Sequence, residues 1–506
     1  MATYRRLMIA FGVLAAATVV WDIAASWHWP LYHDAQIFYF GGHLILHGGM
    51  PYRDLFIMDF PLIFVINAVA IALLSWLGPD VGMRVTDLLG LVALGVAIYH
   101  FFKGECRRAG IAAALLFACY HIALGPTMAN QRDFWMLPFL VAGCHFFATS
   151  LEDADGRRRR NLVIAGVFFG AAMMIKPLPL VLLPMLFLIR PDLRRWRRLA
   201  GDVAVLGAGI GLTVIPFIVW FVTRGALGDV VRMLQYLPIY SRFGARPSVL
   251  ADVDQIFIVL TLACVVAATA PRQTIRNGVL LAGCVYGFAH FHLQAFPWPQ
   301  RLDPLRVFSI LLVFYNLRRL AEARALLPQL ITGLAMVSAL VVFSPGCFGA
   351  LYPLDADRAR REYAKRAQRG ADLERAFAVA APDPARPDEG RTMHFFDTVT
   401  GFWYDHVALG ATTPSGCFAP SIFFIEQQDP AVQALQRKCI NELRRARPKI
   451  IAIVGFSYPY FDRYYTMLEN PLVQHFLDDG YRLVVDRGDE YRIYARTEQT
   501  PRSLER

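Results

Sequence analysis

The stretch LAGDVAVLGAGIGLTVIPFIVWFV, residues 199–222, carries a single charged side chain, Asp202. A helix of about 20 apolar residues crosses the hydrocarbon core of a bilayer, which is about 30 Å thick. The whole chain of 506 residues is 56% hydrophobic and 18% charged, whereas soluble domains are about 25% charged. These values exclude an ordinary soluble enzyme, and 37 glycines and 8 cysteines are too few for a collagen-like or disulfide-scaffold protein. We predict a polytopic α-helical membrane protein.

Apolar runs of this kind are candidate membrane spans. If all of them crossed, with the N-terminus inside, five clusters of basic residues would face outside, against their preference for the cytoplasm. If residues 61–78 instead lie along the outer surface, all five clusters face the cytoplasm, and Pro61, Asn67 and Trp76 suit an interfacial helix. We therefore predict eleven crossings; the alternative is that 61–78 crosses and another span is unrecognised. The twelve runs are 7–25, 61–78, 83–102, 110–125, 133–150, 162–175, 177–189, 199–222, 253–271, 277–296, 304–317 and 326–345.

The positive charge of the chain is confined to this membrane region. The formal net charge is +11, but residues 346–506 hold 22 basic and 22 acidic residues. The preference of basic residues for the cytoplasmic side of a membrane explains this excess of positive charge, and no nucleic acid partner is needed to explain it. An odd number of crossings places the loop at 26–82 (the first loop) and everything after Pro345 outside. We expect a multi-pass protein of a bacterial inner membrane with its C-terminal part in the periplasm; residues 7–25 are an anchor or, alternatively, a cleaved signal peptide.

The sequence after Pro345 predicts a small water-facing domain. Residues 355–378 favour a helix near the lipid surface, residues 382–390 form a linker, and the rest alternates between strand and helix patterns. The predicted parts are a transmembrane module at 1–345, a juxtamembrane helix and linker at 346–391, and an α/β domain at 392–506. Within that domain the predicted strands are 393–399, 450–454, 481–485 and 491–495, and the predicted helix is 431–446. Residues 461–478 are predicted to be largely helical, and residues 487–490 to form a hairpin turn.

Three cysteines, Cys347, Cys417 and Cys439, fall in the part expected outside, where disulfides persist. A disulfide between Cys417 and Cys439 is one possibility that the sequence leaves open. The cysteines inside apolar runs are expected to pack in the core, and the spacing does not resemble a zinc site.

Charged side chains at the ends of membrane spans are costly to bury, so each is a candidate functional residue. Asp34 follows the first span and is either a general base that takes a proton from an acceptor hydroxyl or a solvated loop aspartate. Asp133 opens a span and is either a site residue or a helix N-cap. Lys176 is the only lysine at membrane depth, where its ammonium either binds a phosphate or reaches the interface. Further candidates for binding a substrate or phosphate are Arg53, Asp59, Arg132, His290, His292 and Arg301.

The first loop resembles a known family. The residues Asp34-Ala35-Gln36, Leu46-His47-Gly48-Gly49-Met50-Pro51-Tyr52-Arg53-Asp54 and Asp59-Phe60-Pro61-Leu62 are similar to the first external loop of bacterial GT-C glycosyltransferases. That superfamily includes the protein O-mannosyltransferases and the lipid A aminoarabinose transferases. The resemblance continues in Gln131-Arg132-Asp133 and Ile175-Lys176-Pro177.

The resemblance implies transfer of a sugar from a polyprenyl phosphate, with inversion at the anomeric carbon and without a nucleotide cofactor or a metal. Asp34 matches the catalytic base of the family, Asp133 matches its second acidic residue, and Lys176 matches a lysine that faces the lipid phosphate. The chain departs from the family where Ala35 replaces a second carboxylate and Asp59 replaces a lysine. Either Asp59 is a further acid, or an arginine supplies the missing cation; the candidates are Arg53, Arg132 and Arg301.

The sequence therefore predicts an integral-membrane glycosyltransferase that passes a sugar from a polyprenyl-phosphate donor to a glycan, lipid or protein acceptor of the cell envelope. Two alternatives stay open. A flippase would move the lipid-linked glycan without breaking a bond, although transporters usually place polar groups near the bilayer midplane. A ligase would transfer a whole oligosaccharide from a diphosphate carrier. The sequence predicts neither the sugar, the acceptor, the carrier length nor the oligomeric state.

Overall fold

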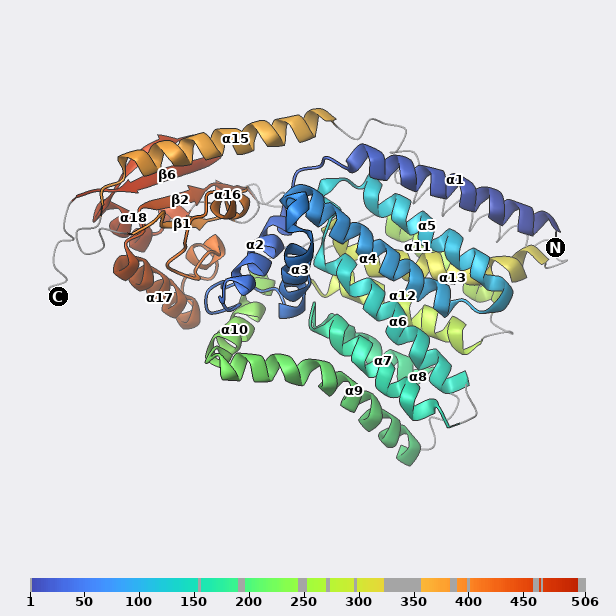
Figure 1. The fold of residues 1–506 in the computed structure, drawn as a ribbon. Coiled ribbons are helices and arrows are strands. Elements are labelled where there is room, and N and C mark those ends of the chain that lie inside the picture. Colours follow the sequence, from blue (N-terminus) through green and yellow to red (C-terminus); the bar gives the residue numbers. More distant parts are fainter. Residues whose placement is uncertain are drawn as a thin grey trace.

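The computed structural model describes residues 2–152, 156–189, 196–243, 253–269, 274–294, 298–322, 356–382, 389–397, 401–457, 464–465 and 467–498. In this part of the chain a bundle of helices lies at one end, and a module of helices around a sheet lies at the other (Figure 1). The N-terminus lies at the end of the bundle far from the module. The candidate span at 326–345 and Cys347 lie outside the described residues.

The helices of the bundle follow the predicted apolar runs. Among the described residues, four helices are long and apolar enough to cross a membrane: Met8–Ser26, Pro79–Phe101, Arg132–Glu152 and Arg197–Thr223. The first and last of these are mostly exposed and apolar, as helices facing lipid are, whereas the third lies at the centre of the bundle. The bundle helices are α1 (Ala2–Ser26), α4 (Pro79–Phe101), α5 (Arg107–Ala123), α6 (Arg132–Glu152), α7 (Arg158–Met173), α8 (Leu182–Leu188), α9 (Trp196–Thr223), α11 (Val253–Thr269), α12 (Ile275–His292) and α13 (Asp303–Glu322).

Glycines allow close contacts between neighbouring bundle helices. A Cβ at Gly166 of α7 would overlap the Leu206 carbonyl oxygen of α9. In the same way, a Cβ at Gly287 of α12 would overlap the backbone of Leu305 in α13. Small residues let helix backbones approach where lipid surrounds them, so α7 with α9 and α12 with α13 form two tight pairs.

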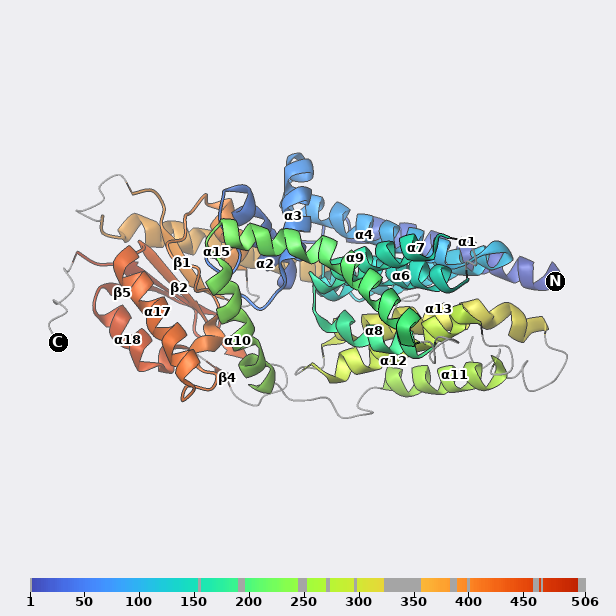
Figure 2. The ribbon, with the colours of Figure 1, turned by 90° about the horizontal axis from the view of Figure 1, so that it is seen from below.

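The first loop carries two helices, α2 (Asp34–Leu46) and α3 (Pro61–Leu74). Pro61 begins α3, where its missing N–H costs nothing. A Cβ at Gly42 would overlap Asn67, so α2 and α3 touch closely. α3 lies across the direction of the bundle helices (Figure 2), as expected of an interfacial helix. The number of crossings stays a prediction.

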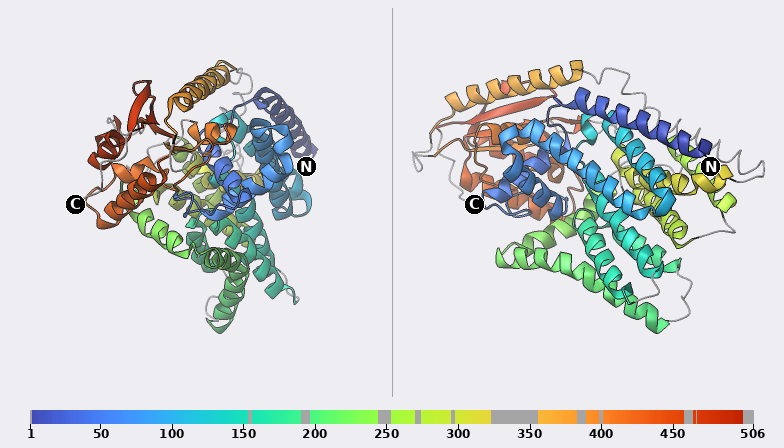
Figure 3. Two further views of the ribbon diagram at one scale, coloured as in Figure 1. Left: turned by 60° about the vertical axis from the view of Figure 1, so that its left-hand side comes forward. Right: turned by 45° about the vertical axis from the view of Figure 1, so that its right-hand side comes forward.

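The C-terminal module, α15 to β6, contains a four-stranded sheet. Its strand order is β1-β2-β6-β5, with β1 parallel to β2 and the other neighbours antiparallel. All five residues of β2 are buried, which explains its continuous apolar sequence. α15 (Ala356–Val379) lies along the sheet (Figure 3), and its Asp372 accepts hydrogen bonds from Arg487 and Tyr491. The other elements are β1 (Met393–Phe396), α16 (Phe402–Ala408), α17 (Pro430–Ala446), β2 (Ile450–Val454), α18 (Pro471–Asp478), β5 (Tyr481–Asp486) and β6 (Tyr491–Arg496).

The strands and helices of the module lie close to the predicted ranges, except for the helix predicted at 461–478. Only its last part is α-helical, because the Asn470 side chain accepts a hydrogen bond from the Leu472 N–H and caps α18. Upstream, β4 (Tyr464–Tyr465) pairs antiparallel with β3 (Phe456–Ser457). The helical part of this range, Met467–Glu469 and Pro471–Asp478, is therefore shorter than predicted.

The first loop packs between the bundle and the module. Its Tyr52 and Phe56 share a hydrophobic core with both, and the Phe56 N–H donates to the Gly416 carbonyl at 2.7 Å. Tyr236 of α10 (Leu227–Phe243) joins the same core. The sequence analysis did not predict α10, because polar residues break its apolar pattern. The loop is thus held on two sides.

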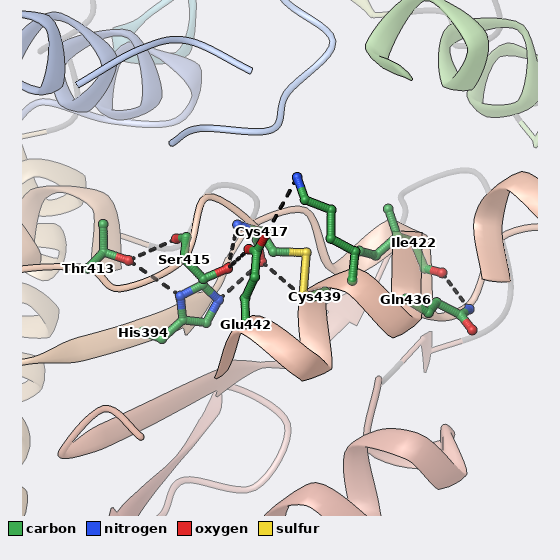
Figure 4. The surroundings of a disulfide bond; sticks show 9 residues. His394, Thr413, Ser415, Cys417, Ile422, Gln436, Cys439 and Glu442 are labelled. Atoms are coloured by element: carbon green, nitrogen blue, oxygen red, sulfur yellow. Dashed lines mark hydrogen bonds and ion pairs between the residues drawn. A yellow bond between two sulfur atoms is a disulfide. The ribbon is translucent and has the colours of Figure 1, made fainter. Parts of the chain in front are cut away.

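A disulfide fixes the part of the module that touches the first loop. Cys417 and Cys439 are bonded, with their Cα atoms 5.6 Å apart (Figure 4). In the same loop the Ser415 hydroxyl donates to Glu442 of α17 at 2.8 Å, and a ring nitrogen of His394 lies 3.1 Å from the Cys417 carbonyl. The pairing that the sequence left open is therefore formed in the structure.

Candidate active site

Asp133 is the centre of a buried cluster of charged side chains. It lies in the first turn of α6, and its side chain is only 2% exposed. Its Oδ1 atom accepts a hydrogen bond from Lys176 Nζ at 2.6 Å and lies 2.8 Å from Nε2 of His290. His290 of α12 is 3.0 Å from the hydroxyl of Tyr286 through its other nitrogen. Three segments far apart in the sequence therefore meet at one carboxylate.

Lys176 is placed by a break between two helices. Its N–H donates to the Ala172 carbonyl at 3.0 Å, and α7 ends just before it. Pro177 follows and starts a short turn in a new direction. The neighbouring Met174 carbonyl accepts a hydrogen bond from the Leu62 N–H of α3 at 2.9 Å. The break thus aims the ammonium at Asp133 and joins it to the first loop.

Asp59 forms an ion pair with Arg132, and both side chains are largely buried. The Asp59 carbonyl accepts a hydrogen bond from the Tyr52 hydroxyl at 2.8 Å. The sequence analysis weighed Asp59 as a further acid because it stands where the family has a lysine. In the structure its charge is balanced by Arg132, the residue next to Asp133.

Asp34 lies at the start of α2 and is 26% exposed, so a substrate is able to reach it. Its Oδ1 is 3.1 Å from Nδ1 of His33. Burial raises the pKa of Asp34, but the charge and hydrogen bond of His33 and the charge of Arg132 outweigh it and bring the pKa below its usual value. Asp133 is also close enough to affect this pKa. Asp34 is therefore ionised near neutral pH and belongs to the electrostatic surroundings of the cluster.

Arg301 is a further buried cation of this site. It is 8% exposed, lies in a 3₁₀ turn before α13, and interacts electrostatically with Asp133, Arg132 and Asp34. Trp298 in front of that turn contacts the ring of His33 at a centroid distance of 6.2 Å. The segment after α12 thus borders the start of α2.

Two predicted site residues lie elsewhere. Arg53 donates to Asp54 at 2.8 Å and lines a separate polar cavity of about 480 Å³ between the first loop, α10 and the module. The ring of His292 packs on Phe288 of its own helix at 4.3 Å. The cluster around Asp133 is therefore formed by Asp34, Asp59, Arg132, Lys176, His290 and Arg301.

Asn130 was not among the predicted site residues, but it fixes the start of α6. Asn130 has a φ of 58°, in the left-handed region, and its N–H donates to Asp87 at 2.8 Å. Its side chain donates to Asn67 at 2.8 Å and accepts from Trp135 at 2.7 Å. Asn130 thus has buried partners on α3, α4 and α6. It therefore fixes the direction of the chain that leads to Arg132 and Asp133.

Asp87 anchors this arrangement and was missed as well. It lies 2.9 Å from Arg84 and 3.1 Å from His121, and all three side chains are buried. A signal was present in the sequence, because charged residues three apart inside an apolar span are costly unless paired. Among the described residues no group of three or more His, Cys, Asp or Glu side chains is arranged to hold a metal ion.

Both the sequence and the fold have relatives among known proteins. Residues 61–220 match the dolichyl-phosphate-mannose-protein mannosyltransferase family, and no curated protein matches the sequence. The structure is similar to ArnT from Cupriavidus metallidurans in the apo state, with a TM-score of 0.59 and 14% identity over 98% of each chain. It is also similar to that protein bound to undecaprenyl phosphate, with a TM-score of 0.55 and 13% identity over 96% of this chain and 98% of the other. The chain has the GT-C fold, as predicted; because a fold does not imply a function, the reaction has to be argued from the site.

Proposed function

We propose that the protein is an integral-membrane glycosyltransferase that moves a sugar from a polyprenyl-phosphate donor to an acceptor of the cell envelope. The observation that carries the proposal is an accessible Asp34 that lies within electrostatic range of Asp133, which forms a buried pair with Lys176. The family match at 61–220 and the GT-C fold support the class of reaction.

Asp34 is the general base. In a single displacement the acceptor oxygen bonds to the anomeric carbon while the bond from that carbon to the phosphate oxygen breaks, which inverts the configuration. The acceptor hydroxyl loses its proton in this step, and Asp34 is able to take it because its carboxylate is ionised and partly exposed. A base in this position contributes about 10²- to 10⁴-fold in rate.

The cations of the cluster stabilise the leaving group. As the bond breaks, negative charge increases on the polyprenyl phosphate, and positioned cations in a water-poor site stabilise such charge strongly. Lys176 and Arg301 are buried side chains that supply this charge, and Arg132 lies beside them with its charge partly balanced by Asp59. The carboxylate of Asp133, which also contacts His290, holds the ammonium of Lys176 in place.

Asp133 has a different role from Asp34. Its side chain is almost completely buried and its Oδ1 is already engaged by two partners. Such a group orients its neighbours better than it accepts a proton from a substrate. We assign Asp133 to the positioning of Lys176.

The disulfide supports the proposed location of the module. Disulfides persist in the periplasm and are rare in the cytosol, so Cys417–Cys439 favours the outer side of the membrane. The Phe56–Gly416 contact puts the first loop on the same side, where a polyprenyl-linked sugar in the outer leaflet would meet it. A multi-pass membrane protein with its module in the periplasm accounts for both the disulfide and the contact of the module with the first loop.

The test uses the full chain in nanodiscs with a panel of synthetic undecaprenyl-phosphate monosaccharides and a cell-envelope extract as the acceptor. We expect undecaprenyl phosphate to be released and the sugar to be incorporated, and Asp34→Asn to abolish both while undecaprenyl phosphate still binds. Asp54→Asn, in the separate polar cavity, is the matched control and should keep turnover.

Three results would contradict the proposal. Full turnover by Asp34→Asn would remove Asp34 from the role of base. Movement of the intact donor across a bilayer without release of the sugar would favour a flippase, and turnover only with a diphosphate-linked oligosaccharide would favour a ligase.

A further inference from the structure

Leu31, three residues before Asp34, is held through both of its backbone polar groups. Its N–H donates to Asp80 Oδ1 at 2.5 Å, and its carbonyl accepts from Arg366 at 3.1 Å. Arg366 also donates to both carboxylate oxygens of Asp80, at 2.8 and 3.2 Å. Gln36 of α2 donates to the same Leu31 carbonyl at 2.9 Å. A side chain of α15, in the C-terminal module, therefore holds the backbone that leads to Asp34.

Arg366 is itself fixed in a shielded position. Its guanidinium lies 3.7 Å from the ring centroid of Tyr404 in α16, a cation–π contact. One turn further along α15, Arg369 pairs with Asp405 of α16 at 2.6 Å. The side chain of Arg366 is 12% exposed and that of Asp80 18%. The pair is thus a largely buried, bidentate contact rather than a mobile surface ion pair.

The backbone between Leu31 and Asp34 includes a strained residue, His33, and depends on this support. His33 has a φ of 54° and a ψ of −139°, a conformation that a residue with a side chain rarely adopts. Such a conformation persists only where the surrounding structure holds it. On the C-terminal side α2 begins directly at Asp34, and on the N-terminal side Asp80 and Arg366 hold Leu31. Without Arg366 the chain is free to relax at His33, and the carboxylate of Asp34 moves with it.

We propose that Arg366 is a positioning residue for Asp34, so that the C-terminal module is part of the catalytic unit. The proposal rests on the proposed function, in which Asp34 is the base. Asp80 and Arg366 act as one clamp on the Leu31 peptide. The module then contributes to the rate through the geometry of the base and not through a contact with the donor.

The first test measures the clamp directly. In the detergent-purified full chain, hydrogen exchange of the peptide covering 28–38 is followed by mass spectrometry. Arg366→Ala should raise that exchange by about tenfold or more, since a restrained backbone opens locally when its contacts are lost. Arg360→Ala is the matched control on the same helix, because the Arg360 side chain is 78% exposed and pairs with Asp357 one turn away. Asp80→Asn is the second variant, which keeps the shape of the side chain if Arg366→Ala proves unstable.

The second test measures turnover in the nanodisc assay. Arg366→Ala should lower kcat by about tenfold to a hundredfold with an unchanged KM for the donor, because a displacement of about 1 Å at a reacting group costs up to about 10²-fold. Arg366→Lys should restore part of kcat, since an ammonium binds Asp80 but cannot form the bidentate contact.

Two outcomes would overturn the proposal: wild-type exchange at 28–38 in both clamp variants, or an unchanged kcat in Arg366→Ala. If the Asp34→Asn protein itself turns over fully, the proposed function fails instead, and the exchange measurement still decides whether the clamp exists.

Discussion

Replacing Asp133 with alanine should leave Lys176 as an uncompensated buried charge. The side chain of Lys176 is 8% exposed, and its 2.6 Å contact with Asp133 would be lost. The contact between Asp133 and His290 would be lost as well. Removing one partner of a buried ion pair costs about 3–5 kcal/mol. The whole stability of a folded domain is about 5–15 kcal/mol, so the variant should be much less stable than the native protein.

The assay is unfolding in mixed micelles at rising SDS content, with and without undecaprenyl phosphate. A phosphate that contacts Lys176 would replace the missing carboxylate, so undecaprenyl phosphate should stabilise Asp133→Ala more than it stabilises the native protein. The control is the double variant Asp133→Leu with Lys176→Met, which removes both charges and should recover most of the stability. It should gain less from undecaprenyl phosphate than Asp133→Ala does, because Arg301 remains but Lys176 is gone.

The reasoning is refuted if Asp133→Ala is as stable as the native protein, or if the double variant is no more stable than the single one. Equal stabilisation of the single and double variants by undecaprenyl phosphate would show that Lys176 does not meet the phosphate.

Asn130→Gly keeps the left-handed backbone but removes the side-chain hydrogen bonds to Asn67 and Trp135, so its free energy of unfolding should fall by about 2–4 kcal/mol in the same SDS assay. Asn130→Ala should lose about 1 kcal/mol more, because alanine is strained in the left-handed region. Equal losses in the two variants would contradict the role of the backbone. Burial lowers the pKa of His394 and of His406 to about 3, against about 6.5 for an exposed histidine. Below about pH 6.5 the unfolded chain therefore binds protons that the folded module does not. As the pH falls from about 6.5 to 3, the free energy of unfolding should decrease by up to about 1.4 kcal/mol per histidine and pH unit. Equal free energies of unfolding at pH 7 and pH 5 would contradict this prediction. The double variant Cys417→Ala with Cys439→Ala opens a loop of 22 residues and should lose about 3 kcal/mol, with more rapid proteolysis of the module; a reducing agent should do the same to the native protein and leave the variant unchanged.

Charge at membrane depth was the most informative feature of the sequence. Asp133 and Lys176 were chosen because a charged side chain in an apolar setting is costly, and the structure brings them into contact. The same argument does not reveal the partner of a charge. Asp59 was therefore weighed as an acid, although Arg132 neutralises it.

Neutral polar residues escaped the sequence analysis for a different reason. Asn130 carries no charge, and its partners Asn67 and Asp87 stand 63 and 43 residues away. Only the folded chain shows that they meet at the start of α6. The contact between Arg366 and Leu31 was hidden in the same way, since 335 residues separate them.

Local patterns predicted most of the module but not its interruptions. The antiparallel pair β5 and β6 follows from two alternating runs around a turn. Residues 461–478, predicted to be largely helical, are helical only in their later part, because the capping Asn470 starts α18 late. Arg53 was grouped with the site by its place in the first loop, but that loop is long enough to reach a second cavity.

The core shared by the first loop and the module has a consequence for how the protein is made. Phe56 leaves the ribosome about 360 residues before its partner Gly416, which at about 5–20 residues per second is a delay of about 20–70 s. During that interval the aromatic side chains of the loop have only the cover that the bundle and α10 supply, and the oxidation that closes Cys417–Cys439 comes later still. The core shared by the first loop and the module is therefore completed only when synthesis is nearly finished.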